Sequence, residues 1–132
     1  IDAKDAGWGL LHGDKIEVLS QTGSGVAGKH RQGGQSAKRF QKLREMELSY
    51  FYNRVADTTR EYFIDIYPVK GLIISGPGPT KEDFINGNYL EYRLQNNIIN
   101  TIDASYSGAE GIREYKELKN TTSLDGKSIR ID

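Results

Sequence analysis

The segment SAKRFQKLREMELSYFYNRVADTTREYFIDIY, residues 36–67, is the longest periodic part of the chain. Mostly apolar side chains recur in it at spacings of three and four, at Phe40, Leu43, Glu47, Tyr50, Phe51, Val55, Thr58, Tyr62 and Ile66. This spacing predicts one amphipathic helix of about eight turns, with Ser36 as its N-cap. Pro68 marks its end, because proline interrupts a continuing helix.

Shorter elements flank this helix on both sides. Residues 8–11 and 16–19 surround turn residues at 12–15, which predicts a β-hairpin. Downstream, we expect strands at 71–75 and 99–105 and a helix at 89–97. Two further helices are predicted from capping-box pairs. Thr80 with Asp83 begins a helix that closes near Asn86-Gly87, and Ser107 with Glu110 begins one that runs toward Leu118.

Strands therefore alternate with helices, and this order predicts an α/β fold. We expect a mixed β-sheet packed with helices, in which the long helix follows an exposed glycine-rich loop at residues 23–35. The 132 residues suit a single domain. We place that domain at residues 1–118 and treat 119–132 as a polar C-terminal extension, with a turn at Asp125-Gly126 and a short edge strand at 129–131.

The composition excludes several classes of protein. The chain has no cysteine, so it has neither a disulfide framework nor a thiolate metal site. Its two histidines, His12 and His30, are too few for a zinc cluster, and we expect no metal and no cofactor. No apolar run reaches the roughly 18 residues that a membrane span needs, and no signal-peptide pattern opens the chain. We therefore expect a cytoplasmic protein without a membrane partner.

Positive charge is concentrated in one part of a chain whose 18 basic and 18 acidic residues balance. No acidic residue lies between Glu17 and Glu45, and this interval holds six basic ones: Lys29, Arg31, Lys38, Arg39, Lys42 and Arg44. Residues 23–29 fit the phosphate-loop pattern G-x-x-x-x-G-K, but His30 follows where Ser or Thr should hold Mg²⁺. Gly33 and Gly34 then delay the helix, which argues against nucleotide binding.

The tripeptide Gly33-Gly34-Gln35 lies between the basic residues and the long helix. Alone, such a tripeptide would be read as a turn before a helix. Two adjacent glycines lack Cβ atoms, however, so their backbone can approach a partner closely. With basic flanks, this loop suits contact with RNA, because binding to phosphates releases counterions.

The run Gly28-Lys29-His30-Arg31-Gln32-Gly33-Gly34-Gln35-Ser36-Ala37-Lys38-Arg39-Phe40 closely resembles the signature of class I peptide chain release factors of the archaeal and eukaryotic type. Two later parts of the chain resemble the archaeal branch: residues 76–81 with 87–90, and 103–106 with 110–114. The resemblance covers roughly residues 1–114 and is to the middle domain of those proteins. The segment from about residue 115 onward does not match it, and the motifs that read stop codons belong to another domain.

The resemblance implies that the protein triggers hydrolysis of the peptidyl-tRNA ester in the ribosomal peptidyl transferase centre. Gly33, Gly34 and Gln35 are then the catalytic residues, and the Gln35 amide is an expected methylation site. Because a neutral amide does not titrate, Gln35 would orient water or exclude bulkier nucleophiles rather than act as a base. We assign the contacts with rRNA and tRNA to Lys29, His30, Arg31, Lys38, Arg39 and Lys42; the competing interpretation of the three helical residues is a solvated face.

The implied partners are the ribosome, the P-site peptidyl-tRNA and, through other domains, a translational GTPase. The chain is not expected to be an enzyme by itself, because hydrolysis would require the ribosome. Two alternatives stay open: an RNA-docking module without a catalytic role, and a rescue-type paralogue that frees nascent chains without reading a codon.

Overall fold

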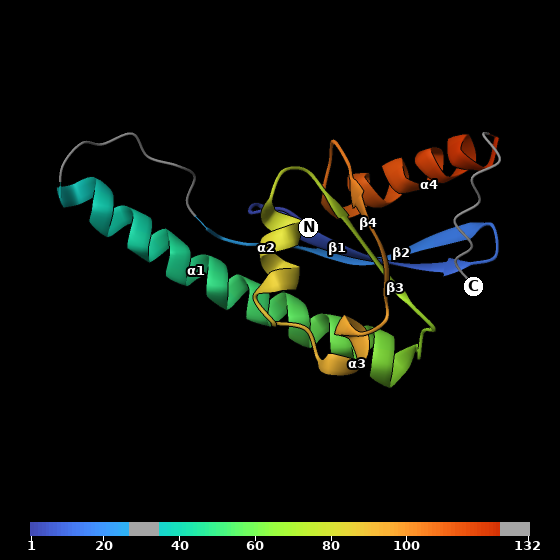
Figure 1. Ribbon diagram of the computed structural model, residues 1–132, viewed down its shortest axis with the longest axis horizontal. Helices are drawn as coiled ribbons and strands as arrows, with labels where there is room; N and C mark the ends of the chain where they lie inside the picture. The colour runs from blue at the N-terminus through green and yellow to red at the C-terminus, as the bar shows by residue number, and fades with distance from the viewer. Residues whose placement is uncertain (27–34, 125–132) are drawn as a thin grey trace.

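The computed structural model describes residues 1–26 and 35–124. Figure 1 shows three layers, in which α4 covers one side of the strands and α1 the other. The elements follow the order β1 (Asp5–His12), β2 (Lys15–Gly23), α1 (Gln35–Arg60), η1 (Glu61–Ile66, a π-helix), β3 (Leu72–Gly76), α2 (Thr80–Asn86), α3 (Tyr92–Gln95), β4 (Ile98–Asp103) and α4 (Gly108–Leu124). The predicted α/β class is confirmed.

The predicted hairpin is present as the antiparallel pair β1 and β2, in which His12 lies opposite Lys15. Its turn is tight because Gly13 adopts φ of +56°, a conformation that glycine reaches without a steric penalty. The two faces of β1 carry different residues. Trp8 and its alternate neighbours are buried toward α1, whereas a Cβ on Gly7 would lie 2.7 Å from the Gly108 backbone. Glycine at this position therefore lets α4 pack closely on the hairpin.

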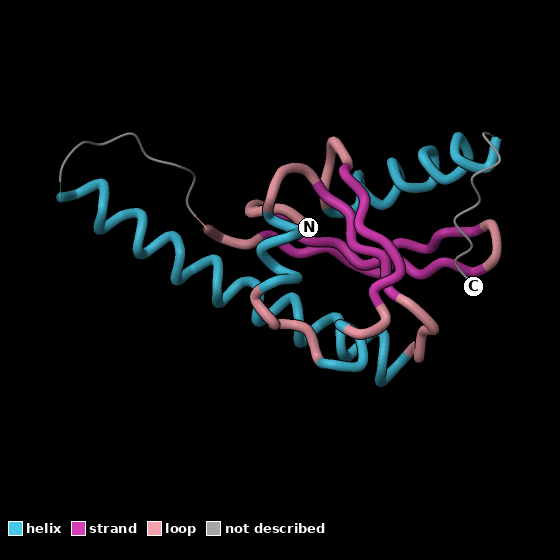
Figure 2. The backbone as a smooth tube through the Cα atoms, in the orientation of Figure 1, coloured by secondary structure: helices cyan, strands magenta, loops and turns pink. Residues whose placement is uncertain are grey.

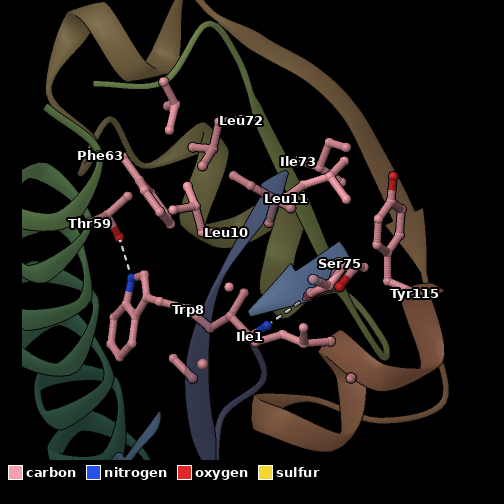
Figure 3. Close-up of a pocket in the computed structure, with 18 of the residues that line it drawn as sticks. Ile1, Trp8, Leu10, Leu11, Thr59, Phe63, Leu72, Ile73, Ser75 and Tyr115 are labelled. Carbon is pink, nitrogen blue, oxygen red and sulfur yellow. Dashed lines mark hydrogen bonds between the residues drawn. The ribbon is translucent and has the colours of Figure 1, made fainter. Parts of the chain in front are cut away.

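The described strands form two two-stranded sheets, an antiparallel one of β1 with β2 and a parallel one of β3 with β4 (Figure 2). The sequence predicted one mixed sheet instead. A cavity of about 530 Å³ lies between β1 and β3 and is lined by residues of both strands (Figure 3). The nitrogen of Ile1 donates a hydrogen bond of 2.7 Å to the Ser75 carbonyl, so Ile1 uses an acceptor that a neighbouring strand would need.

The core lies where the second half of α1 meets the strands. Phe51 has no exposed surface, and Val55 and Phe63 are buried with Trp8 and Leu72 in the same cluster. The Trp8 indole Nε1 donates to Thr59 Oγ1 at 2.9 Å (Figure 3), and the Thr59 hydroxyl donates to the Val55 carbonyl at 2.6 Å. The buried Trp8 indole N–H and the buried Thr59 hydroxyl therefore each have a hydrogen-bond partner.

Several predicted helix ends are wrong. α1 begins at Gln35, so Ser36 lies inside the helix and is not its N-cap. Pro79 is the N-cap of α2, and Thr80 is already helical. Before α4, the Ser107 hydroxyl donates to the Asp5 carboxylate, and Glu110 pairs with Arg113 at 2.5 Å, so neither side chain completes a capping box.

The lengths of two predicted helices also differ. The helix expected at 89–97 is only the single turn of α3, because Glu91 is its N-cap and accepts a hydrogen bond from the Arg93 backbone N–H. α4 continues past Leu118 to Leu124. The turn at 125–126 and the edge strand at 129–131 lie outside the described residues. Within the described parts, no helix is long and apolar enough to cross a membrane.

Candidate nucleic-acid interface

The predicted site residues lie at and before the first turn of α1. Gln35 is the first helical residue, and the described chain resumes there after Val26. Gly33 and Gly34, with Lys29, His30 and Arg31, lie outside the described residues. The structure therefore gives the two attachment points of the loop, Val26 and Gln35, and the helix that carries it.

The first half of α1 extends beyond the rest of the molecule, as Figure 1 shows. In this half, the side chains of Leu43 and Met46 are 51% and 52% exposed, and Tyr50 just beyond it is 62% exposed, although the helical period predicted a buried apolar stripe that includes Leu43 and Tyr50. No described element covers this half of the helix on that side, so periodicity predicted the helix correctly and its contacts incorrectly. The exposed half presents Gln35 away from the body of the domain.

Basic residues dominate the exposed end of α1. Lys38, Arg39 and Lys42 are all exposed, and none of them takes part in an ion pair between described residues. The first turn holds no acidic residue. Because the positive end of the helix dipole opposes nearby cations, this arrangement does not favour the helix itself. It does favour an anionic partner, since the helix begins here and three exposed cations lie within its first eight residues.

An aromatic cluster fixes α1 to α2 behind this basic end. The ring of Tyr52 meets those of Phe84 and Tyr89 edge-on, with centroids 5.8 Å and 5.2 Å away. The Tyr89 hydroxyl also donates to Ser49 Oγ at 3.2 Å. Burial raises the pKa of Tyr52, and the neighbouring Asp83 carboxylate acts in the same direction. Tyr52 therefore stays neutral at physiological pH and serves packing rather than proton transfer.

Two residues at the other attachment point of the loop were not predicted from the sequence. Ser24 is 9% exposed, and its backbone carbonyl accepts a hydrogen bond of 3.1 Å from Arg54 Nη2. Both residues are polar and lie outside the quoted motif, so no sequence signal distinguished them from ordinary surface residues.

The chemistry available in the described residues is limited to amides, hydroxyls and cations at this end. No group of three or more His, Cys, Asp or Glu side chains within the described residues could hold a metal ion.

Comparisons with known proteins identify the family of the chain. A family model described as eRF1 domain 2 matches residues 1–124. Peptide chain release factor subunit 1 of Pyrococcus abyssi is 41% identical over 133 aligned positions, which cover 98% of this chain and 32% of that protein. The same factor of Thermococcus onnurineus is 42% identical over 120 positions, covering 89% and 29%. The chain thus spans about a third of the length of these relatives.

Solved structures show the same fold. The crystal structure of the archaeal translation termination factor aRF1 superposes with a TM-score of 0.69 at 23% identity, over 96% of this chain and 38% of that one. A second structure, described as an archaeal protein, gives 0.67 at 24% identity, over 96% and 37%. The resemblance to the middle domain of archaeal release factors is confirmed, and the chain belongs to the eRF1 domain 2 family.

Proposed function

We propose that the chain acts in translation termination and triggers hydrolysis of the peptidyl-tRNA ester in the ribosomal peptidyl transferase centre. The observation that carries the proposal is the position of Gln35, directly after Gly33 and Gly34, at the start of a helix whose exposed basic end extends beyond the body (Figure 1). Membership of the release-factor family supports it.

In this mechanism, water attacks the ester carbonyl carbon, and the bond to the tRNA ribose oxygen breaks. The products are the free peptide and a tRNA with its hydroxyl restored. Gln35 orients the water or excludes bulkier nucleophiles, and a backbone N–H at Gln35 stabilises the developing oxyanion. Gly33 and Gly34 permit the close approach, because neither has a Cβ. Methylation of the Gln35 amide would keep it neutral and leave this role intact.

Binding is assigned to the basic residues, with the ribosome and the P-site peptidyl-tRNA as partners. Lys29, His30 and Arg31 would contact RNA before the glycines, and Lys38, Arg39 and Lys42 would contact phosphates after them. A translational GTPase would act through other domains of a longer protein in the cytoplasm. We place the end of the domain near residue 118, and the reaction needs no cofactor of its own.

The test compares Gln35→Ala and Gly34→Ala with the unchanged longer factor on ribosomes stalled at a stop codon. We expect peptide release to fall by at least about a hundredfold in each variant, because an oxyanion or water contact contributes that much. Melting temperatures should stay within about 2 °C, since neither residue belongs to the described core.

The same assay separates the alternatives. An RNA-docking module would keep its release activity in Gln35→Ala and lose it only when basic residues are replaced. A rescue-type paralogue would release peptide equally well from ribosomes with and without a stop codon.

A further inference from the structure

Residues 24–26, at the start of the glycine-rich loop, are fixed to the body of the domain. The Ser24 backbone N–H donates to the Lys4 carbonyl and the Ser24 hydroxyl to the Ala3 carbonyl, both at 2.7 Å. The Val26 N–H in turn donates to Ser24 Oγ at 3.0 Å. One hydroxyl thus accepts and donates at once, and it ties the outgoing chain to the segment before β1.

Arg54 fixes the same residues to α1. Its Nη2 donates to the Ser24 carbonyl at 3.1 Å, and its guanidinium lies over the Phe51 ring, 5.5 Å from the centroid. Phe51 is fully buried, so the guanidinium packs against a ring that the core holds in place. Val26 packs against the core beside these contacts.

We propose that Ser24 and Arg54 form a clamp that positions the Gly33-Gly34-Gln35 loop for the reaction. The inference rests on the proposed function. Both ends of the loop are then tied to one helix, the far end directly at Gln35 and the near end through Arg54. Neither clamp residue touches a reacting atom; both are positioning residues.

Loss of the clamp would move the last fixed residue before the loop from Val26 back to Gly23, the end of β2. The effective concentration of a group at any one place falls as more residues separate the group from its last fixed point. Small misplacements of a reacting group are costly, since about 1 Å can cost on the order of a hundredfold in rate. Binding by the exposed basic residues of α1 should change little, because the helix keeps its position.

The clamp can be measured without any release assay. The chain has no cysteine, so Ala27→Cys gives a single site for a nitroxide label next to Val26. We expect the label to become clearly more mobile in Ser24→Ala and in Arg54→Ala. It should stay as in the parent in Arg54→Lys, which keeps a cationic donor, and in Arg60→Ala, which removes an exposed arginine of the same helix outside the clamp.

Release is then measured in the longer factor without the label. We expect Ser24→Ala and Arg54→Ala to lower the maximal rate constant about tenfold. The factor concentration at half-maximal rate should change less than twofold, and Arg54→Lys should restore most of the rate. The double variant should lose no more than the worse single one, because both residues hold the same chain.

Unchanged label mobility in both clamp variants would overturn the clamp, and so would slower release without greater mobility. Failure of the proposed function looks different: Gln35→Ala would still release peptide, whatever the label reports.

Discussion

Lys81 is a charged side chain in the interior of the domain, with 1% of its surface exposed. Its Nζ lies 2.6 Å from Asp103 Oδ1 and 3.4 Å from Glu82 Oε1, and it donates to the Gly78 carbonyl at 2.9 Å. Burial works to lower the pKa of Lys81, but the hydrogen bonds to Asp103 and Glu82 outweigh it, so the pKa is raised above 10.5. The lysine therefore joins α2 to the end of β4 as a cation.

We predict that Lys81→Met lowers the free energy of unfolding at pH 7 by about 1–2 kcal/mol. The expected loss is small because the Asp103 carboxylate is exposed, and solvent weakens its attraction to Lys81. Because the folded pKa is the higher one, the contribution is complete below pH 10.5 and is lost as the pH rises through the folded value. Urea unfolding at pH 7, 9 and 11 should show the difference from the parent shrinking only at the highest pH. Lys70→Met, at an exposed lysine, serves as the control; a constant difference at all three values would refute the assignment.

Neighbouring residues of α1 differ sharply in their surroundings. Phe51 is fully buried, whereas Tyr50 is 62% exposed. We predict that Phe51→Ala lowers the free energy of unfolding by about 3–5 kcal/mol, because it leaves a cavity in the core. Tyr50→Ala, the matched control, should change it by no more than about 0.5 kcal/mol. Chemical denaturation followed by Trp8 fluorescence measures both, and a similar loss in the two variants would mean that the Tyr50 side chain is covered in solution.

The basic end of α1 leads to a prediction about salt. Each phosphate contact contributes about 0.7 to the slope of log affinity against log salt for single-stranded nucleic acid. We expect Lys38→Gln and Lys42→Gln to lower that slope by about this amount each in filter binding with RNA. Lys116→Gln, at an exposed lysine on α4, should leave the slope unchanged. Equal slopes in all variants would assign Lys38 and Lys42 to a solvated face.

Several helices and strands could be predicted from the sequence, because side-chain periodicity and turn residues determine their type. The hairpin and the strand at Leu72–Gly76 were predicted correctly, whereas the single helix predicted over 36–67 is α1 as far as Arg60 and then the π-helix η1. The capping residues were not, because Ser107 uses its hydroxyl on Asp5, which is far away in the sequence. The period of α1 also could not show that Leu43 would remain exposed, since an apolar stripe reports a helix face and not what covers it.

For the chain by itself, we predict no hydrolysis of peptidyl-tRNA free in solution. The interval between Glu17 and Glu45 has no carboxylate and the chain has no cysteine, so the loop brings neither a carboxylate base nor a thiol nucleophile, and the neutral Gln35 amide does not titrate. Incubating the chain with peptidyl-tRNA, with and without ribosomes, measures this. Rapid turnover without ribosomes that disappears in Gln35→Ala would show that the active site is complete in this chain.

The candidate site was predictable only as a motif with its charges. Gly33-Gly34-Gln35 and the basic residues stand together in the sequence, so no tertiary information was needed to find them. The contact of Ser24 with Arg54 could not be predicted from the sequence, because 30 residues separate them and the contact depends on how α1 lies against the hairpin. The roles of the loop residues stay predictions.

The length of α1 sets how stiffly the domain must hold it. Gln35 lies roughly 25 Å along the helix from Tyr52, at 1.5 Å per residue, so the helix is a lever whose bearing is the aromatic cluster. A tilt of about 5° at the bearing would sweep the tip through roughly 2 Å, more than the tolerance of a reacting group. Stacked rings and a buried phenylalanine make such a bearing stiff. Under the proposed function, the position of Gln35 would therefore depend on side chains that lie far behind it along the helix.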